Sequence, residues 1–255
     1  MKTKTALITG ASSGIGLELA KQFARGNWNL ILVARREPEL RALAASLKVQ
    51  TQVVVADLTR VEERDRLIES LRDTPVDCLV NNAGFADYSP FTKAEWNKNA
   101  ALLHLNIEAL THLTHAFLSG MLERKRGRIL NIASTAAFFP GPGMATYYAS
   151  KAYVLSFSEA LATELENTGV SVTCLCPGAT ISEFQERAGM NSSKLMESAM
   201  MSAEQVARAG YKATVRGQRL VIPGVMNAFL TLLPRVLSRK RVALLVRDVQ
   251  APKSH

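Results

Sequence analysis

Near its start the chain carries an apolar run that ends at Thr9, three glycines at Gly10, Gly14 and Gly16, and then apolar residues at helical spacing. This order predicts a strand, a tight turn and the start of a helix. The first glycine permits the sharp turn, the second lets the backbone approach a pyrophosphate, and the third lets the helix pack closely on its strand. The amino end of the helix offers free N–H groups and a positive dipole end to phosphates. The stretch therefore favours a dinucleotide site, although a glycine-rich turn without a ligand has the same pattern.

Strand-like apolar runs alternate with helical patterns along the rest of the chain. The runs are short and continuous, which is typical of parallel strands buried on both faces. Alternation at this spacing predicts right-handed crossovers and a parallel sheet. The predicted fold class is α/β: a doubly wound, mainly parallel seven-stranded sheet with helices on both faces, in a single domain with a helical C-terminal extension. Strands are expected to end at residue 9 and to lie at 29–34, 52–56, 78–80, 127–133, 170–176 and 220–222, with helices at 38–47, 60–71, about 98–123, 145–167 and about 203–215.

The cysteines carry no pattern of metal ligands. Cys78, Cys174 and Cys176 each lie in a strand-like run, so we expect buried free thiols in a reducing cytoplasm. No second ligand pair accompanies Cys174 and Cys176 to bind zinc, and we predict no metal site. We also expect no signal peptide, because the chain enters its first strand by about residue 4. No apolar run approaches the ~18 residues of a membrane-spanning helix.

The end of the second predicted strand bears on the choice between NAD and NADP. An acidic residue there would bind the ribose 2′-hydroxyl of NAD, whereas a basic residue favours the 2′-phosphate of NADP. Here Ala34 leaves no acid, and Arg35 offers a planar fork of donors. The position predicts NADP(H), with a solvated flank of the next helix as the alternative interpretation.

Several motifs in one order resemble the short-chain dehydrogenase/reductase family, in its branch of about 250 residues. The resemblance covers the chain to about Gly224 and implies catalysis by Ser134, Tyr147 and Lys151 with help from Asn106. Its motifs are Thr9-Gly10-Ala11-Ser12-Ser13-Gly14-Ile15-Gly16, Asp57-Leu58, Asn81-Asn82-Ala83-Gly84, Asn106, Ser134, Tyr147-Tyr148-Ala149-Ser150-Lys151 and Pro177-Gly178. The cofactor-binding residues that it implies are Gly10, Ser12, Ser13, Gly14, Ile15, Gly16, Arg35, Asp57, Leu58, Asn82, Ala83, Gly84, Tyr147, Lys151, Pro177, Gly178, Thr180 and Ser182.

The chain departs from the family pattern after Pro177-Gly178. An aliphatic residue and a threonine are common two and four positions further on, and Thr180 and Ser182 stand there instead. The hydroxyl of Ser182 can still donate to the nicotinamide amide.

The spacing of Tyr147 and Lys151 carries the expected chemistry. Four residues apart on a helix, they face the same side. A phenol has a pKa near 10, and a neighbouring ammonium should move that pKa toward neutral. In reduction Tyr147 would protonate the carbonyl oxygen, while Ser134 would donate a hydrogen bond to it. Lys151 would also hold the nicotinamide ribose, and by resemblance Asn106 would hold a water that links Lys151 to solvent.

The regions beyond the core bear on the substrate. We expect residues 1–183 to form the cofactor-binding core with the catalytic residues, 184–218 a substrate lid, and 219–255 the last strand and a basic helical tail. The stretch 184–201 is rich in methionine, whose flexible thioethers suit either an adaptable apolar pocket or simple gap-filling. The net charge is +9, and from Arg208 onward ten Lys and Arg side chains face one acid, Asp248. The tail is expected to meet a membrane, to meet an acyl carrier, or only to close the fold.

The predicted activity is an NADP(H)-dependent oxidoreductase acting on the carbonyl or alcohol of an apolar substrate, such as a steroid-like or acyl ketone. The alternatives are a non-catalytic NADP-binding sensor and a membrane-surface protein that uses the tail. We expect a homodimer or homotetramer in the cytoplasm, with peripheral attachment at the membrane as the alternative. No nucleic-acid partner is predicted, because no basic surface with interleaved aromatic residues is visible.

Overall fold

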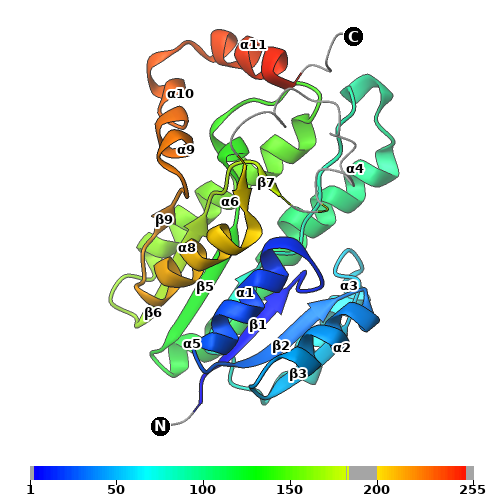
Figure 1. Cartoon of the computed structure of the whole chain (residues 1–255), viewed down its shortest axis with the longest axis vertical. Coiled ribbons are helices and arrows are strands. Elements are labelled where there is room, and N and C mark those ends of the chain that lie inside the picture. The colour runs from blue at the N-terminus through cyan, green and yellow to red at the C-terminus, as the bar shows by residue number, and fades with distance from the viewer. Residues whose placement is uncertain (1–2, 182, 184–199, 251–255) are drawn as a thin grey trace.

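A seven-stranded parallel sheet forms the centre of the computed structural model, which describes residues 3–181, 183 and 200–250 (Figure 1). The strand order is β3-β2-β1-β4-β5-β6-β9, and every neighbouring pair is parallel. The sheet confirms the predicted fold class, with all pairs parallel rather than most. Its strands are β1 (Thr5–Thr9), β2 (Asn29–Ala34), β3 (Thr51–Val55), β4 (Cys78–Asn81), β5 (Gly127–Ile132), β6 (Val170–Leu175) and β9 (Leu220–Val221).

Helices cover both faces of this sheet. Successive strand side chains point to opposite faces, so Ile8 packs among α1, α2 and α8, while Leu7 packs among α3, α5 and α6. Both side chains are fully buried, as the continuous apolar runs of the sequence predict. The helices are α1 (Gly14–Arg25), α2 (Glu37–Ser46), α3 (Val61–Ser70), α4 (Trp96–Leu103), α5 (Leu110–Glu123), α6 (Ala145–Glu164) and α8 (Ala203–Val215).

The helical stretch from α4 to α5 is not uniform. A π-helical segment, His104–Ala109, joins the two helices, where the sequence predicts one regular helix. Such a segment holds one residue more per turn than an α-helix, and apolar spacing does not reveal it. It places Asn106 in the middle of the irregular turn, and Asn106 is buried.

Several smaller elements complete the fold. A short parallel pair, β7 (Thr180–Ile181) with β8 (Met201–Ser202), was not predicted. Ser202 caps α8, since its hydroxyl accepts from the Gln205 N–H at 3.1 Å. Two single-turn 3₁₀ helices complete the region, Phe91–Lys93 and Thr135–Phe138.

The C-terminal tail is helical, as expected. It comprises α9 (Val225–Leu230), α10 (Leu233–Val236) and α11 (Arg239–Gln250), drawn orange to red at the top of Figure 1. Pro234 lies in the first turn of α10, where proline costs no helical hydrogen bond. Among the described residues no helix has both the length and the hydropathy to cross a membrane. The predicted boundaries of the core, lid and tail stay predictions, and residues 184–199 of the expected lid lie outside the described part of the chain.

Candidate active site

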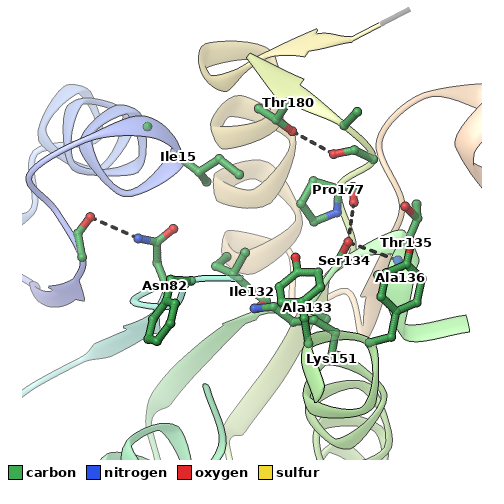
Figure 2. A pocket seen from close by; sticks show the side chains of 18 of the residues that line it. Ile15, Asn82, Ile132, Ala133, Ser134, Thr135, Ala136, Lys151, Pro177 and Thr180 are labelled. Atoms are coloured by element: carbon green, nitrogen blue, oxygen red, sulfur yellow. Dashed lines mark hydrogen bonds between the residues drawn. The ribbon is translucent and has the colours of Figure 1, made fainter. Parts of the chain in front are cut away.

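The carboxyl ends of β1, β4, β5 and β6 border one cavity of about 1010 Å³. Open parallel sheets bind ligands at this edge. Figure 2 shows part of the cavity, with Ile15 and Asn82 on one side and Ser134, Lys151 and Pro177 across from them. Gly16 and Asn106 do not line it, and Ser182 lies outside the described residues. The sequence-predicted residues that line it are Gly10, Ser12, Ser13, Gly14, Ile15, Arg35, Asp57, Leu58, Asn82, Ala83, Gly84, Ser134, Tyr147, Lys151, Pro177, Gly178 and Thr180.

The glycine-rich turn has the geometry that a phosphate cradle requires. Gly10 and Gly14 have φ of 66° and 55°, in the left-handed region that favours glycine. A Cβ on Gly16 would stand 2.3 Å from the Gly10 carbonyl oxygen, so only glycine fits where α1 begins. The first turn of α1 contains no acidic residue, and the Ser13 side chain does not cap it. Its N–H groups therefore remain available for an anion, and the residues present fit a dinucleotide.

Asn82 braces this turn from the neighbouring strand. Its side-chain amide donates to the carbonyl oxygens of Thr9 at 2.9 Å and Gly10 at 3.2 Å. The Thr9 hydroxyl in turn accepts from the N–H groups of Asn82 and Ala83, each at 3.0 Å. Asn82 thus shapes the turn as well as bordering the cavity.

Two arginines follow β2 at the other end of the cradle. The Arg35 side chain is 69% exposed and stands 3.8 Å from the Asp57 carboxylate. Arg36 is held more firmly, because its guanidinium donates to the Ser12 hydroxyl and carbonyl at 3.2 Å. The sequence analysis assigned a binding role to Arg35 alone. Arg36 could have been found from its place directly after Arg35. The guanidinium of Arg35 is therefore the more exposed of the two.

Ser134, Tyr147 and Lys151 converge beyond the end of β5. The Ser134 hydroxyl donates to the Pro177 carbonyl at 3.4 Å and accepts from the Ala136 N–H at 3.1 Å (Figure 2). The Lys151 ammonium lies 5.8 Å from the centre of the Tyr147 ring. It donates to the carbonyl oxygen of Ile132, the last residue of β5, at 2.8 Å. One helix, α6, therefore sets both the phenol and the ammonium beside the strand end that precedes Ser134.

Burial is the main cause of the pKa shifts of Tyr147 and Lys151. It raises the pKa of Tyr147, and a hydrogen bond with the Ser134 side chain opposes the rise. Burial also lowers the pKa of Lys151 to about 8, against the opposing effects of Cys174 and Cys176. The expected lowering of the Tyr147 pKa by Lys151 is therefore wrong. The reason is that removing the phenol from water outweighs an ammonium that is itself poorly solvated.

Asn106 reaches this group from the π-helical segment. Its side-chain amide donates to the Phe85 carbonyl and to the Ser150 hydroxyl, each at 3.1 Å, and its oxygen accepts from the Phe85 N–H at 3.2 Å. A Cβ on Gly84 would lie 2.9 Å from the Asn106 oxygen and 3.6 Å from the Lys151 nitrogen. Asn106 and Lys151 thus flank the same glycine. The sequence prediction missed Phe85 and Ser150 as partners of Asn106.

The segment after β6 closes the cavity on its remaining side. The Thr180 hydroxyl donates to the Gly178 carbonyl at 3.0 Å. Gly178 is covered by the tail, since a Cβ there would stand 2.5 Å from the side-chain oxygen of Asn227. Asn227 was not predicted, because it is distant in sequence and matches no motif. Met201 lines the cavity, whereas Met190 and Met196 of the expected lid lie outside the described residues.

The tail supplies part of the apolar wall of the cavity. Apolar side chains of the tail line the cavity. A contact of the tail with a membrane or an acyl carrier stays a prediction. The Tyr88 hydroxyl donates to the Gln250 carbonyl at 2.6 Å, and the Gln250 side chain bonds the Tyr148 hydroxyl. Burial raises the pKa of Tyr148 to about 12, opposed by that bond. The tail residues at the wall are Val225, Met226, Asn227, Leu230, Leu233, Val242, Leu245, Val246, Val249 and Gln250.

The cysteines and histidines form no metal site in the part of the chain that the structure describes. Cys78, Cys174 and Cys176 are buried free thiols, as predicted. The sulfurs of Cys174 and Cys176 lie 3.7 Å apart. His104 pairs with Glu108 at 2.6 Å rather than with other ligand-type residues.

Comparison with known proteins agrees with this geometry. The family model described as short chain dehydrogenase matches residues 4–193. A short-chain dehydrogenase from Sphingobium yanoikuyae, solved in complex with NADPH, is 34% identical with a TM-score of 0.83, and the match covers 98% of each chain. The bulky-bulky ketone specific alcohol dehydrogenase from Comamonas testosteroni is 32% identical with a TM-score of 0.79, over 100% of this chain and 98% of that one.

A curated relative matches over a shorter range. The very-long-chain 3-oxoacyl-CoA reductase of Phaeosphaeria nodorum is 39% identical over 183 residues, which is 67% of this chain. The chain spans about half the length of that relative, 53%. The family model agrees with the glycine cradle after β1 and with the grouping of Ser134, Tyr147 and Lys151. The chain therefore belongs to the short-chain dehydrogenase/reductase family of Rossmann-fold oxidoreductases.

Proposed function

We propose that this protein is an NADPH-dependent reductase of bulky apolar ketones, or the corresponding alcohol dehydrogenase, with Tyr147 as the general acid and base. The observation that carries the proposal is the convergence of Ser134, Tyr147 and Lys151 at a cavity that begins at the glycine cradle and ends in an apolar wall. The likeness to the ketone-specific and NADPH-bound enzymes supports it.

The chain's own residues divide the cofactor-binding work. The glycine cradle and the amino end of α1 would hold the pyrophosphate, Arg35 the phosphate on the adenosine ribose, and Lys151 the nicotinamide ribose. When bound, NADPH supplies the hydride. Thr180 and Ser182 would bind the nicotinamide amide through their hydroxyls.

Tyr147 and Ser134 act on the substrate oxygen. The raised pKa of Tyr147 keeps its phenol protonated at neutral pH, which is the form that donates a proton to a carbonyl oxygen. The Ser134 hydroxyl would turn from Pro177 to donate to the same oxygen, an interaction that strengthens as negative charge develops there.

Lys151 and Asn106 would return the proton. The lowered pKa of Lys151, about 8, allows its amine to exchange protons near neutral pH. Asn106 and Lys151 both lie next to Gly84, and Asn106 would hold the water that connects the amine to solvent. We also propose that the chain forms a homodimer or homotetramer, and that its tail contacts a membrane or an acyl carrier.

Single substitutions of the two adjacent tyrosines test the assignment. Tyr147→Phe should lower kcat for NADPH-dependent ketone reduction at least ~100-fold, the scale of a lost general acid, while NADPH still binds. Tyr148→Phe should keep turnover, since its hydroxyl bonds Gln250 rather than Lys151. A panel of bulky and small ketones, followed by NADPH absorbance, provides the measurement.

The same panel separates the reductase from a non-catalytic NADP-binding sensor. Tight NADPH binding by calorimetry with no oxidation of any ketone or alcohol would favour the sensor. Full turnover in Tyr147→Phe would remove that residue from the mechanism.

A further inference from the structure

Arg64 on α3 is a fully buried arginine, with 0% of its surface exposed. Charged side chains are almost never fully buried unless they are paired, because removing a charge from water is costly. Among the described residues its Nε has no hydrogen-bond partner. A stabilising role is therefore a poor explanation for this side chain, since an apolar residue of similar volume commonly stabilises such a site as well or better.

The guanidinium of Arg64 contacts both ends of the π-helical segment. It donates to the carbonyl oxygen of His104 at 3.4 Å and pairs with the carboxylate of Glu108. The other oxygen of Glu108 bonds the His104 ring at 2.6 Å. One planar side chain thus links His104, the first residue of the segment, to Glu108 near its end. The fork of an arginine suits two acceptors better than a lysine does.

This segment determines where Asn106 points. A π-helical turn carries an extra residue and is less stable than a regular turn, so it persists where other contacts hold it. If it relaxed to an α-helix, the register would change by one residue, which is a rotation of about 100° around the helix axis. The hydrogen bonds from Asn106 to Phe85 and Ser150, and its place beside Lys151, depend on the irregular turn.

We propose that Arg64 is a positioning residue: by bracing the π-helical segment it holds Asn106 in its bonds with Phe85 and Ser150, close to Lys151, and so sets the rate of proton return to the active site. The inference rests on the proposed function for the part that concerns proton transfer. The bracing itself depends only on the contacts of Arg64 with His104 and Glu108.

The primary variant is Arg64→Met, which removes the charge and keeps most of the volume. We expect kcat to fall about 10- to 100-fold, the range that a misplacement of about 1 Å can produce. KM for the ketone and Kd for NADPH should stay within about twofold, because Arg64 does not line the cavity. Arg64→Lys should recover part of kcat through a single charged donor.

Amide hydrogen exchange of the cofactor-free protein gives a readout apart from turnover. In Arg64→Met the amides of the π-helical segment should exchange faster, while those of β1 and β5 stay protected. The matched control is Arg66→Met on the same helix, since Arg66 is exposed and bonds only the Glu62 carbonyl among the described contacts. It should leave kcat and exchange unchanged.

Glu108→Gln provides a second variant should Arg64→Met fail to fold. The Glu108 side chain is about half exposed, so the change is mild, and it should lower kcat at unchanged KM. Unchanged kcat and exchange in either folded variant would overturn the inference, as would a fall in kcat that accompanies faster exchange throughout the sheet. Full turnover in Tyr147→Phe would instead overturn the proposed function, while local exchange at the segment would still test the bracing by Arg64.

Discussion

At the scale of single residues, Arg35 and Arg36 differ in what their guanidinium groups already bind. Arg36 is engaged by Ser12, Glu39 and Glu183, whereas the guanidinium of Arg35 is largely exposed. Arg35→Ser should therefore weaken NADP(H) binding by ~2 kcal/mol, the scale of a charged hydrogen bond, and spare NAD(H). Calorimetric titration with both cofactors checks this, with Arg41→Ser on α2 as the control. Equal binding of NADH and NADPH by the unaltered protein would contradict the role of Arg35.

The residue identities of the site were predictable, but their ionisation was not. Ser134, Tyr147 and Lys151 stand in motifs that the sequence displays directly. The pKa of Tyr147 depends on how much water surrounds the phenol, and that is decided by the side chains of its cluster, such as Ala86 and Leu102, which come from other elements of the fold. Spacing on one helix therefore predicts that Tyr147 and Lys151 share a face, and it does not predict which physical effect dominates there.

At the scale of elements, the contact of α1 with the glycine-rich turn leaves no room for a side chain at Gly16. Gly16→Ala should lower the free energy of unfolding by about 1–3 kcal/mol, the usual cost of overpacking, and weaken NADPH binding. Gly120→Ala on α5 is the matched control, because its new methyl would meet only the flexible end of Arg124. That variant should gain up to ~1 kcal/mol from helix propensity. Denaturant unfolding measures the free energy of unfolding of the two variants. Equal stabilities of Gly16→Ala and Gly120→Ala would contradict the close contact at Gly16.

The sequence predicted some of the helices and strands better than others. Continuous apolar runs identified the buried strands, and Ser202 identified the start of α8. The π-helical segment escaped prediction because its extra residue leaves the apolar spacing of α4 and α5 nearly intact. The burial of Arg64 was not predicted either. On a helix of mixed charge an arginine is expected to face solvent, and only the packing of α3 against the neighbouring helical segment shows that it is buried.

At the scale of the whole molecule, the tail is fastened to the site by residues far apart in sequence. The Tyr88 hydroxyl reaches the Gln250 carbonyl at 2.6 Å. Tyr88→Phe should cost about 1 kcal/mol of local stability, so amides of α11 should exchange faster and KM for a bulky ketone should rise about fivefold. A small ketone should be unaffected. Tyr153→Phe, which removes an exposed bond to Thr111, is the control, and a similar change there would argue against a specific fastening.

The central place of β1 in the sheet has a consequence for synthesis of the chain. β1 pairs with β2 on one side and with β4 on the other, so its second edge stays open until β4 has been made. At roughly 5–20 residues per second a ribosome needs several seconds to add the intervening residues. During that interval the nascent chain presents an apolar, unpaired strand edge, which is a template for association with other chains. We therefore expect a polypeptide that stops after Val55 to aggregate, and the full-length protein to depend on a chaperone during translation more than after it.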